Sequence, residues 1–347
     1  MTSDAMTVTS TLVSTILNEY GAMTRAALRD YLPAREPRRH LYDLVAEYPL
    51  RGGKMMRSSL CIATACAFGA CPQDALAVAV SIELLHNALL IHDDIEDGSE
   101  QRRGQATLHV EHGVPLALNA GDTLTLVSLR PLLENHGRFS GDLAMRIVRE
   151  TERMALMSAE GQAMELGWRQ DNRIDLDDAD YLQMVLKKTC WLATIYPLRA
   201  GALIGTRAAI DLDAFMRFGF FLGATFQIQD DLLNLVADQS YGKERDGDLW
   251  EGKRTLMLIR LLRESTPAER ERLANILRAG RKERTVDDVI WMRAQMDRYG
   301  CIAYARRYAH RLAGAALHEY SLAFSNIPES RDKRFLEEMV TWVVERN

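Results

Sequence analysis

The sequence predicts an all-α fold, in which residues 1–347 form a single domain with a central helical bundle ringed by further helices. Three observations support this prediction. Only nine prolines occur in 347 residues, long segments carry apolar residues at helical spacing, and no run of useful length alternates apolar and polar residues. Many of the predicted helices are apolar on most faces, which is typical of helices buried inside a bundle.

The predicted helices follow one another along the chain. Gly98 is a natural helix stop, and acidic residues open the segment near Asp177, where the helix dipole favours them. In order, we predict helices over residues 7–30, from "RGGKMMR" through Phe68, from Pro72 to Asp97, from near Pro115, from near Gly141, from near Asp177, from Asp213 to about Ala237, and several shorter ones from Gly252 onward.

The charge and composition exclude several classes of protein. The formal net charge of −5 argues against a broad nucleic-acid-binding surface. The longest apolar candidate, around residues 60–70, is broken by "CPQD" and falls short of the roughly 18 residues of a membrane span, so we expect none. The amino-terminal segment lacks the pattern of a signal peptide, and the five cysteines form no C-x-x-C pair. We therefore expect a cytoplasmic protein with reduced thiols.

The stretch "LLHNALLIHDDIEDGSEQRRG" places four acidic residues at the carboxyl end of an apolar helix. The helix dipole disfavours anions at that end, so a positive group must offset them. Asp93 and Asp97 are four residues apart and project to nearly the same side of the helix, with Asp94 beside them. Carboxylates in this arrangement suit Mg²⁺, which takes one or two of them together with phosphate oxygens. For this motif alone, a solvated acidic helix end is the alternative.

A second acidic pair favours the metal site. Asp230 and Asp231 lie in the apolar segment "FQIQDDLLN", and Gln227 precedes them. Buried acidic clusters are costly unless a cation compensates them. Basic residues follow each pair, namely Arg102, Arg103, Lys243 and Lys253. Mg²⁺ between two acidic helices, surrounded by arginine and lysine, is typical of a diphosphate site.

Five motifs in this order resemble the trans-isoprenyl diphosphate synthases, also called polyprenyl synthetases. They are "GGKMMR" from Gly52, "HDDIEDGSEQRRG" from His92, "KTCWL" from Lys188, "FQIQDDLLN" from Phe226 and "GKERDGDLWEGKRTL" from Gly242. The resemblance covers about residues 40–260. It implies the isoprenoid-synthase type of helical bundle around a central apolar cavity, and it implies a homodimer.

The resemblance also implies a role for each matching residue. Asp93 and Asp97, with Asp94 nearby, would bind Mg²⁺ on the allylic diphosphate, and Asp230 would hold a further Mg²⁺ with Asp231 beside it. The allylic diphosphate would contact Arg102, Lys188, Thr189, Gln227, Lys243 and Lys253, and Lys188 and the five aspartates would lie closest to the chemistry. Isopentenyl diphosphate would contact Lys54, Arg57, His86 and Arg103, although His86 alone would fit an ordinary core histidine. The chain departs from the family at Asn234, where a third aspartate is usual, so we expect weaker metal affinity there.

The activity that the resemblance implies is a Mg²⁺-dependent head-to-tail condensation of isopentenyl diphosphate with an allylic diphosphate. The allylic carbon–oxygen bond ionises, the isopentenyl double bond attacks the cation, and a proton is lost. The helix bearing Asp93 is expected to line the tunnel for the growing chain, with Ala88 and Leu89 facing it. Because Ala88 is small, we expect a C20 product, as in geranylgeranyl diphosphate, with C15 or longer chains (C25 and above) as alternatives.

Two other functions share part of this pattern. A class I terpene cyclase uses the same ionisation but needs no isopentenyl diphosphate site, and Lys54, Arg57 and Arg103 argue against it. A non-catalytic partner subunit of another synthase typically loses one aspartate cluster, whereas this sequence keeps both apart from Asn234. The prenyl diphosphate synthase therefore accounts for more of the sequence than either alternative.

Overall fold

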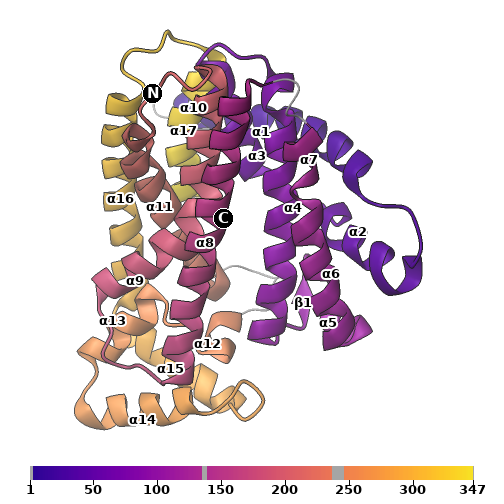
Figure 1. The fold of residues 1–347 in the computed structure, drawn as a ribbon. Helices are drawn as coiled ribbons and strands as arrows, with labels where there is room; N and C mark the ends of the chain where they lie inside the picture. The colour runs from indigo at the N-terminus through magenta and orange to yellow at the C-terminus, as the bar shows by residue number, and fades with distance from the viewer. Residues whose placement is uncertain (1–2, 135–138, 237–245, 347) are drawn as a thin grey trace.

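Helices account for nearly all of the regular structure, as the sequence predicts. The computed structural model describes residues 3–134, 139–236 and 246–346, and within these ranges the one sheet is a two-stranded antiparallel ribbon. In that ribbon Gln101 pairs with Ala106 and Arg102 with Gln105. Figure 1 shows the longer helices side by side along one direction, with the short helices of residues 247–298 (orange) at the lower end.

The elements before residue 135 comprise one long helix, α4, and the elements that surround it. They are α1 (Ser3–Tyr31), the π-helical turn η1 (Arg38–Tyr42), α2 (Asp43–Leu50), α3 (Met56–Ala67), α4 (Pro72–Asp97), β1 (Gln101–Arg102), β2 (Gln105–Ala106), α5 (Leu108–His112), α6 (Val114–Val127) and α7 (Arg130–Glu134).

The elements after residue 138 supply the facing helices and the lower end. They are α8 (Gly141–Gln170), α9 (Asp178–Val185), the π-helix η3 (Leu186–Ile195), α10 (Tyr196–Gly205), the 3₁₀ helix η4 (Leu212–Phe215), α11 (Met216–Val236), α12 (Gly247–Glu251), α13 (Leu256–Glu264), α14 (Pro267–Arg278), α15 (Val286–Arg298), α16 (Cys301–Ala323) and α17 (Arg331–Glu345). The predicted end of α11 at Ala237 lies outside the described residues.

Helix α4 has the predicted bounds because both of its ends carry local signals. Pro72 occupies the first turn, and the Asp74 carboxylate accepts a hydrogen bond of 3.1 Å from the backbone N–H of Cys71. At the other end Gly98 adopts φ +64°, the left-handed conformation that favours glycine and ends the helix. The acidic motif therefore lies in the last turn of this helix.

Two groups of buried apolar side chains form the core, and α4 belongs to both. Its Ile82 and Leu85 pack in the larger group with residues of α3, η3, α10, α11, α16 and α17. Its Leu84 and Ala88 pack in the smaller group with residues of α2 and α6. A helix buried from both sides must be apolar around its circumference, which explains the absence of a single apolar face in the sequence.

The expectation that no apolar stretch reaches the length of a membrane span was wrong for α4. By length and composition the helix Pro72–Asp97 would suffice, with a mean hydropathy of 1.6 over an 18-residue window. However, 67% of that window is buried inside the fold. The apolar residues of α4 are accounted for by its central position in the bundle.

Candidate active site

A cavity of about 470 Å³ lies between α4, α8, η3 and α11, with the turn after α12 at its edge. Both acidic motifs reach it: Asp93 comes from α4, and Asp230 and Asp231 come from α11. Two helices that are separated by more than a hundred residues in the chain therefore present carboxylates to one space. This is the arrangement on which the sequence prediction depends.

The three aspartates of the first motif lie in different surroundings. Asp93 lines the cavity, whereas Asp94 and Asp97 are not among the lining residues, and their side chains are each 1% exposed. Asp94 accepts hydrogen bonds from the Tyr48 hydroxyl and, at 2.8 Å to each carboxylate oxygen, from Nε of Arg102. It is one residue, or about 100°, around the helix from Asp93, which accounts for its different direction.

Asp97 lies beneath a lysine that does line the cavity. Its Oδ2 is 2.7 Å from Nζ of Lys253, and its Oδ1 pairs with Arg169 of α8. We expected Asp93 and Asp97 to project to nearly the same side of the helix. Only Asp93 lines the cavity, because Lys253 and Arg169 cover the side chain of Asp97. Asp97 can reach a ligand there only if its ion pair with Lys253 breaks.

Cations also surround Asp93. Nζ of Lys188 lies 3.2 Å from its Oδ1, and Nη2 of Arg102 lies 3.5 Å from its Oδ2. Burial alone would raise the pKa of Asp93, but Lys188, Lys253 and Arg102 outweigh it and hold the pKa well below its usual value. Asp93 is therefore a carboxylate throughout the neutral range and is available as an oxygen ligand.

Lys188 sits between two acids. Its Nζ is 2.9 Å from Oε1 of Glu165 in α8, in addition to its contact with Asp93. Burial lowers the pKa of this lysine, but the carboxylates of Asp93 and Glu165 raise it above its ordinary value. A charged ammonium group is thus maintained inside the cavity.

The π-helix η3 brings two neighbouring residues to the cavity, Lys188 and Thr189. Wider helical turns of this kind occur frequently at functional sites. Oγ1 of Thr189 donates a 2.7 Å hydrogen bond to Oε1 of Gln227 in α11, and Nε2 of Gln227 donates one of 2.7 Å to Asp231. The motifs at residues 188 and 226 therefore meet across the cavity.

The second acidic pair is held from two sides. The Tyr181 hydroxyl donates a 2.8 Å hydrogen bond to Asp231. Burial raises the pKa of Asp231 to about 7, although the hydrogen bonds from Gln227 and Tyr181 lower it. Asp230 faces Arg346, with a distance of 3.5 Å between Oδ1 and Nη2.

Asn234, the residue that departs from the family motif, has a structural partner. Its side-chain Oδ1 accepts a 3.1 Å hydrogen bond from the backbone N–H of Asp248, and its carbonyl accepts one of 3.1 Å from the N–H of Asp246. The residue thus satisfies donors at the start of α12, where orphan N–H groups need acceptors. It also lines the cavity beside Asp231 and Asp248.

The residues expected to bind isopentenyl diphosphate differ in how far they lie from the cavity. Arg57 and His86 line the cavity. Arg103 lies behind them, where its Nη1 donates to the carbonyl of Tyr48 at 3.1 Å and to Oδ1 of Asn87 at 3.2 Å. Burial lowers the pKa of His86 well below its usual value, and Arg57 and Arg103 lower it further, so the imidazole is neutral at pH 7.

Four further predicted residues remain, and they differ in whether they line the cavity. Arg102 and Lys253 line it. Lys54 is exposed, is not among the lining residues, and lies over the ring of Trp342 at 5.4 Å. Lys243 lies outside the described residues.

The two residues expected to face the growing chain separate. Leu89 lines the cavity, but Ala88 is fully buried in the smaller group of core residues, so the expectation that Ala88 faces the cavity was wrong. The helical turn explains the difference. Leu89 is four residues, or about 400°, from Asp93 and shares its side, whereas Ala88 is about 500° away and points elsewhere.

Several residues at the site carry no signal in the sequence. Gln162 and Glu165 of α8 line the cavity and contact Asp93 and Lys188 respectively, but nothing local links this polar helix to the first motif. Arg346, near the end of α17, stacks on the ring of Phe226 at 4.0 Å and donates to its carbonyl at 3.0 Å. These contacts join segments far apart in the chain, and only the folded structure reveals them.

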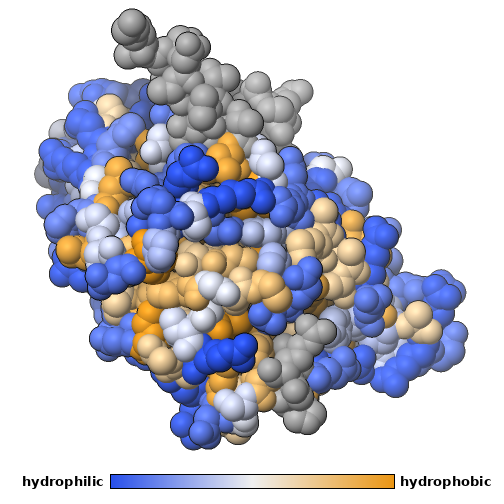
Figure 2. All heavy atoms as spheres, turned by 90° about the horizontal axis from the view of Figure 1, so that it is seen from above, coloured by the Kyte–Doolittle hydropathy of each residue, from blue (hydrophilic) through white to orange (hydrophobic). Residues whose placement is uncertain are grey.

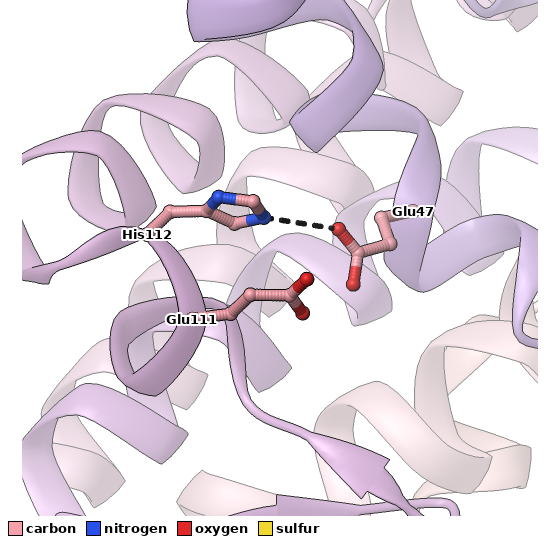
Figure 3. Close-up of side chains that lie close together, drawn as sticks. All are labelled: Glu47, Glu111 and His112. Atoms are coloured by element: carbon pink, nitrogen blue, oxygen red, sulfur yellow. Dashed lines mark ion pairs between the residues drawn. The ribbon is translucent and has the colours of Figure 1, made fainter.

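A second group of metal-ligand side chains lies outside this cavity. Glu47 of α2 and Glu111 and His112 of α5 place one ligand atom each within 4.8 Å of one another (Figure 3). Nε2 of His112 is 3.6 Å from Glu47, and Arg51 also pairs with Glu47. Because Arg51 already balances the Glu47 carboxylate, the group is accounted for as a polar cluster that joins α2 to α5.

The donors at the cavity fit a hard divalent cation. Carboxylate oxygens are the ligands that Mg²⁺ and Ca²⁺ prefer, and Asp93 from α4 and Asp230 and Asp231 from α11 supply them at the cavity. Arg102, Lys188 and Lys253 stand beside them as partners for phosphate oxygens. The residues therefore suit a metal ion that arrives with a diphosphate.

Comparison with known proteins agrees with this arrangement. A model of the polyprenyl synthetase family matches residues 39–295. The chain is 33% identical over 336 residues to the short chain isoprenyl diphosphate synthase of Methanothermobacter thermautotrophicus, which covers 96% of this chain and 98% of the relative. Other relatives are named geranylgeranyl, geranylfarnesyl and octaprenyl synthases, in Geoglobus acetivorans, Natronomonas pharaonis and Haemophilus influenzae respectively, so the names span several chain lengths.

Solved structures show the same fold. Geranylgeranyl pyrophosphate synthetase from Pyrococcus horikoshii Ot3 superposes with a TM-score of 0.84 at 29% identity, covering 97% of this chain and 99% of that one. Polyprenyl synthase from Caulobacter crescentus CB15, solved in complex with calcium and isoprenyl diphosphate, gives a TM-score of 0.83 at 26% identity, with 96% and 97% covered. The two acidic helices that share a cavity and the family match over most of its length lead to one conclusion: this chain belongs to the polyprenyl synthetase family and is a prenyltransferase of the isoprenyl diphosphate synthase class.

Proposed function

We propose that this enzyme condenses isopentenyl diphosphate head to tail with an allylic diphosphate, that it depends on Mg²⁺, and that its main product is the C20 geranylgeranyl diphosphate. The observation that carries the proposal is the single cavity shared by Asp93 of α4 and Asp230 and Asp231 of α11. Cationic side chains line the same cavity, as the binding of a diphosphate requires.

The bound divalent cations would stabilise the negative charge that develops on the leaving diphosphate. Asp93 and Asp230 would hold them from opposite helices, with Asp97 joining once its ion pair with Lys253 breaks. Lys188, Arg102 and Lys253 would bind the oxygens of the allylic diphosphate, and Thr189 and Gln227 would donate or accept further hydrogen bonds there. These groups are already in place before the reaction, which is the condition for electrostatic preorganisation.

Isopentenyl diphosphate would bind at the cationic side of the cavity. Arg57 and Arg103 can grip phosphate oxygens with paired donors, and Lys54 would act as a compact charge at the edge. Neutral His86 would donate a hydrogen bond without adding charge. In the reaction the allylic carbon–oxygen bond breaks, the isopentenyl double bond forms the new carbon–carbon bond, and the departing diphosphate accepts the proton that is lost.

The apolar part of the cavity supports the proposed product length. Leu89, Leu166 and Leu192 line it together with the small residues Ala159 and Ala163. An aliphatic tail gains about 0.8 kcal/mol for each CH₂ that it buries, so elongation continues until a side chain blocks the tunnel. No aromatic side chain precedes Asp93 by one turn on α4, which favours a C20 product over C15.

The test is product chromatography of the purified protein with isopentenyl diphosphate and each of dimethylallyl, geranyl and farnesyl diphosphate, with Mg²⁺ and with EDTA. We expect C20 product with Mg²⁺ and none with EDTA. A C15 product, or products of C25 and above, would contradict the proposed length. Consumption of the allylic diphosphate without isopentenyl diphosphate would instead indicate a terpene cyclase.

Substitution of Leu89 tests the position of the tunnel. Leu89→Phe should shorten the main product by at least one five-carbon unit, because the ring would fill the cavity one turn from Asp93. Ala88→Phe should instead reduce stability, because Ala88 has no space around it in the core. Unchanged product length for Leu89→Phe would show that the chain grows along another wall.

We also propose that the protein acts in the cytoplasm as a homodimer of single polyprenyl synthetase domains. The family model spans 257 of the 347 residues, counting 39 to 295 inclusive, without interruption. Exposed apolar side chains lie on α6, α7 and α8 and in the turn between α6 and α7, namely Val114, Leu118, Leu126, Leu129, Leu133, Met145, Val148 and Leu156. A second copy of the chain would remove these from water.

A further inference from the structure

Glu251, the last residue of α12, contacts the active-site lysine from behind. Its side chain is 8% exposed and is not among the residues that line the cavity. Its Oε2 lies 2.9 Å from Nζ of Lys253, which does line the cavity. Glu251 therefore influences the cavity only through the residue that it holds.

The other carboxylate oxygen of Glu251 is anchored to two further segments. Oγ of Ser99, just after the end of α4, donates to Oε1 at 3.1 Å. Nη1 of Arg281, in the connection between α14 and α15, donates to the same oxygen at 3.3 Å. One buried carboxylate thus joins the end of the first aspartate motif, the turn of Lys253 and the α14–α15 connection.

The turn between Glu251 and Lys253 is itself fixed. Gly252 adopts φ +70°, and the N–H of Lys253 donates to the carbonyl of Asp248 at 2.9 Å. Buried Arg284 donates to the carbonyl of Leu249 at 2.7 Å, which holds the end of α12 in place. The side chains of residues 251 and 253 are consequently kept on the same side of the turn.

Lys253 divides its ammonium group between two acids. Asp97 is 2.7 Å away and Glu251 is 2.9 Å away. A divalent cation and a diphosphate at the first motif would take Asp97 away from this lysine. A buried ammonium group without a carboxylate partner is costly, so a second acid behind it determines whether Lys253 stays at the cavity wall.

We propose that Glu251 is a positioning residue for the allylic diphosphate. It keeps Lys253 at the cavity when Asp97 turns to the metal ion. The inference deepens the proposed function and rests on it. It names Glu251 and, through it, Ser99 and Arg281 as parts of the site that touch neither substrate nor metal.

The experiment compares wild type with Glu251→Gln, a change that keeps the shape and removes the charge. We expect the KM for the allylic diphosphate to rise about tenfold while the KM for isopentenyl diphosphate stays within about twofold. The reason is that the charge-assisted contact of Lys253 is lost, and Lys253 binds the allylic diphosphate only. A second measurement avoids catalysis: calorimetry with Mg²⁺ and inorganic pyrophosphate should show the dissociation constant rising by about the same factor.

A double-mutant cycle then tests whether Glu251 acts through Lys253. In a Lys253→Ala background, Glu251→Gln should change the pyrophosphate dissociation constant by less than about twofold, because the residue that it holds is gone. Arg281→Gln removes an anchor of Glu251 without touching Lys253 and should raise the allylic KM in the same direction. Arg281→Gln also tests the inference if Glu251→Gln does not fold.

The matched control is Glu319→Gln, which removes a mostly buried acid paired with Arg217 at 2.7 Å on α16, away from the cavity. It should leave both KM values unchanged. An equal rise of both KM values for Glu251→Gln, additive effects in the cycle, or unchanged pyrophosphate binding would each overturn the inference. If wild type forms no prenyl diphosphate at all, the proposed function fails instead, and the two failures are distinguishable.

Discussion

At the scale of single residues, the first aspartate motif contains three carboxylates with different tasks. Asp93 faces the cavity, Asp97 pairs with Lys253 and Arg169, and Asp94 is buried against Arg102 and Tyr48. The motif "DDIED" therefore supplies both a carboxylate at the cavity and a structural anchor for the arginine that follows it. Arg102 reaches the cavity because Asp94 holds it by Nε and Nη2.

Substituting these neighbours separates the two tasks. Asp93→Asn should lower kcat by at least about 100-fold, because its charge serves the ligand. Its loss of unfolding free energy should be smaller than that of Asp94→Asn, because Lys188 keeps Glu165 and Arg102 keeps Asp94 as acidic partners. Asp94→Asn should lower the free energy of unfolding by about 3 kcal/mol, because it leaves the Arg102 guanidinium buried without its carboxylate. Urea denaturation and steady-state rates measure both quantities. Equal stability losses in the two variants would contradict the assignment.

At the scale of elements, the π-helix η3 depends on glycines from the helices on either side. A Cβ on Gly161 of α8 would lie 2.1 Å from the backbone nitrogen of Lys188, and one on Gly223 of α11 would lie 2.9 Å from Cα of Cys190. Both helices thus approach the backbone of η3 more closely than any side chain permits. This close packing sets where Lys188 and Thr189 enter the cavity.

Gly161→Ala should therefore displace η3. We expect a loss of about 1–3 kcal/mol in the free energy of unfolding, as for other overpacked cores, and a fall in kcat as Lys188 moves from Asp93. Gly167→Ala is the matched control on the same helix, because no atom lies within 4 Å of the added Cβ. It should stabilise the protein by about 0.5–1 kcal/mol through helix propensity. Similar losses in both variants would show that the packing against η3 is not responsible.

The amino terminus of α14 gives a prediction on pH. The pKa of Glu269 falls from 4.5 to about 2, because the Tyr299 hydroxyl and Thr266 donate hydrogen bonds to its carboxylate. A carboxyl whose pKa is lowered by folding stabilises the native state above its unfolded pKa and loses that contribution as it becomes protonated. The difference in unfolding free energy between wild type and Glu269→Gln should therefore be constant above pH 5 and shrink between about pH 4.5 and 2. Chemical denaturation at several pH values measures it, and a difference independent of pH would refute the effect.

The elements also show which features of the fold and the site could be predicted from the sequence and which could not. The bounds of α4 follow from signals inside the segment, Pro72 and Gly98, and the two acidic motifs identify Asp93, Asp230 and Asp231 by local pattern. The π-helix and the cover over Asp97 depend on Gly161 and Arg169 of α8, whose contacts cross the fold. Ala88 could have been assigned correctly from the helical angle alone. Arg346 could not, because nothing in its segment relates it to α11.

At the scale of the whole molecule, α4 separates two groups of packed helices, and the cavity opens beside its last turns. Figure 2 shows that the surface is not uniformly hydrophilic, since apolar side chains (orange) are exposed among polar ones on the upper face. Among the large apolar side chains whose exposure the structure describes, Leu126 of α6 is the most exposed, at 70%. With Leu118 and Leu133 it belongs to the apolar side chains of α6, α7 and α8 that we propose as the interface of a homodimer.

Leu126→Glu tests that assignment. A carboxylate at the centre of an apolar interface would lose its water without gaining a partner, and two copies would carry it toward each other, so association should weaken by several kcal/mol. We expect a dimer for wild type and a monomer for the variant in sedimentation velocity at micromolar concentration, with the far-ultraviolet circular dichroism unchanged. Leu322→Glu on α16 is the matched control, because Leu322 is 59% exposed and lies outside these helices, so that variant should remain a dimer. A wild-type monomer would contradict the homodimer. Dissociation of both variants alike would contradict this position of the interface.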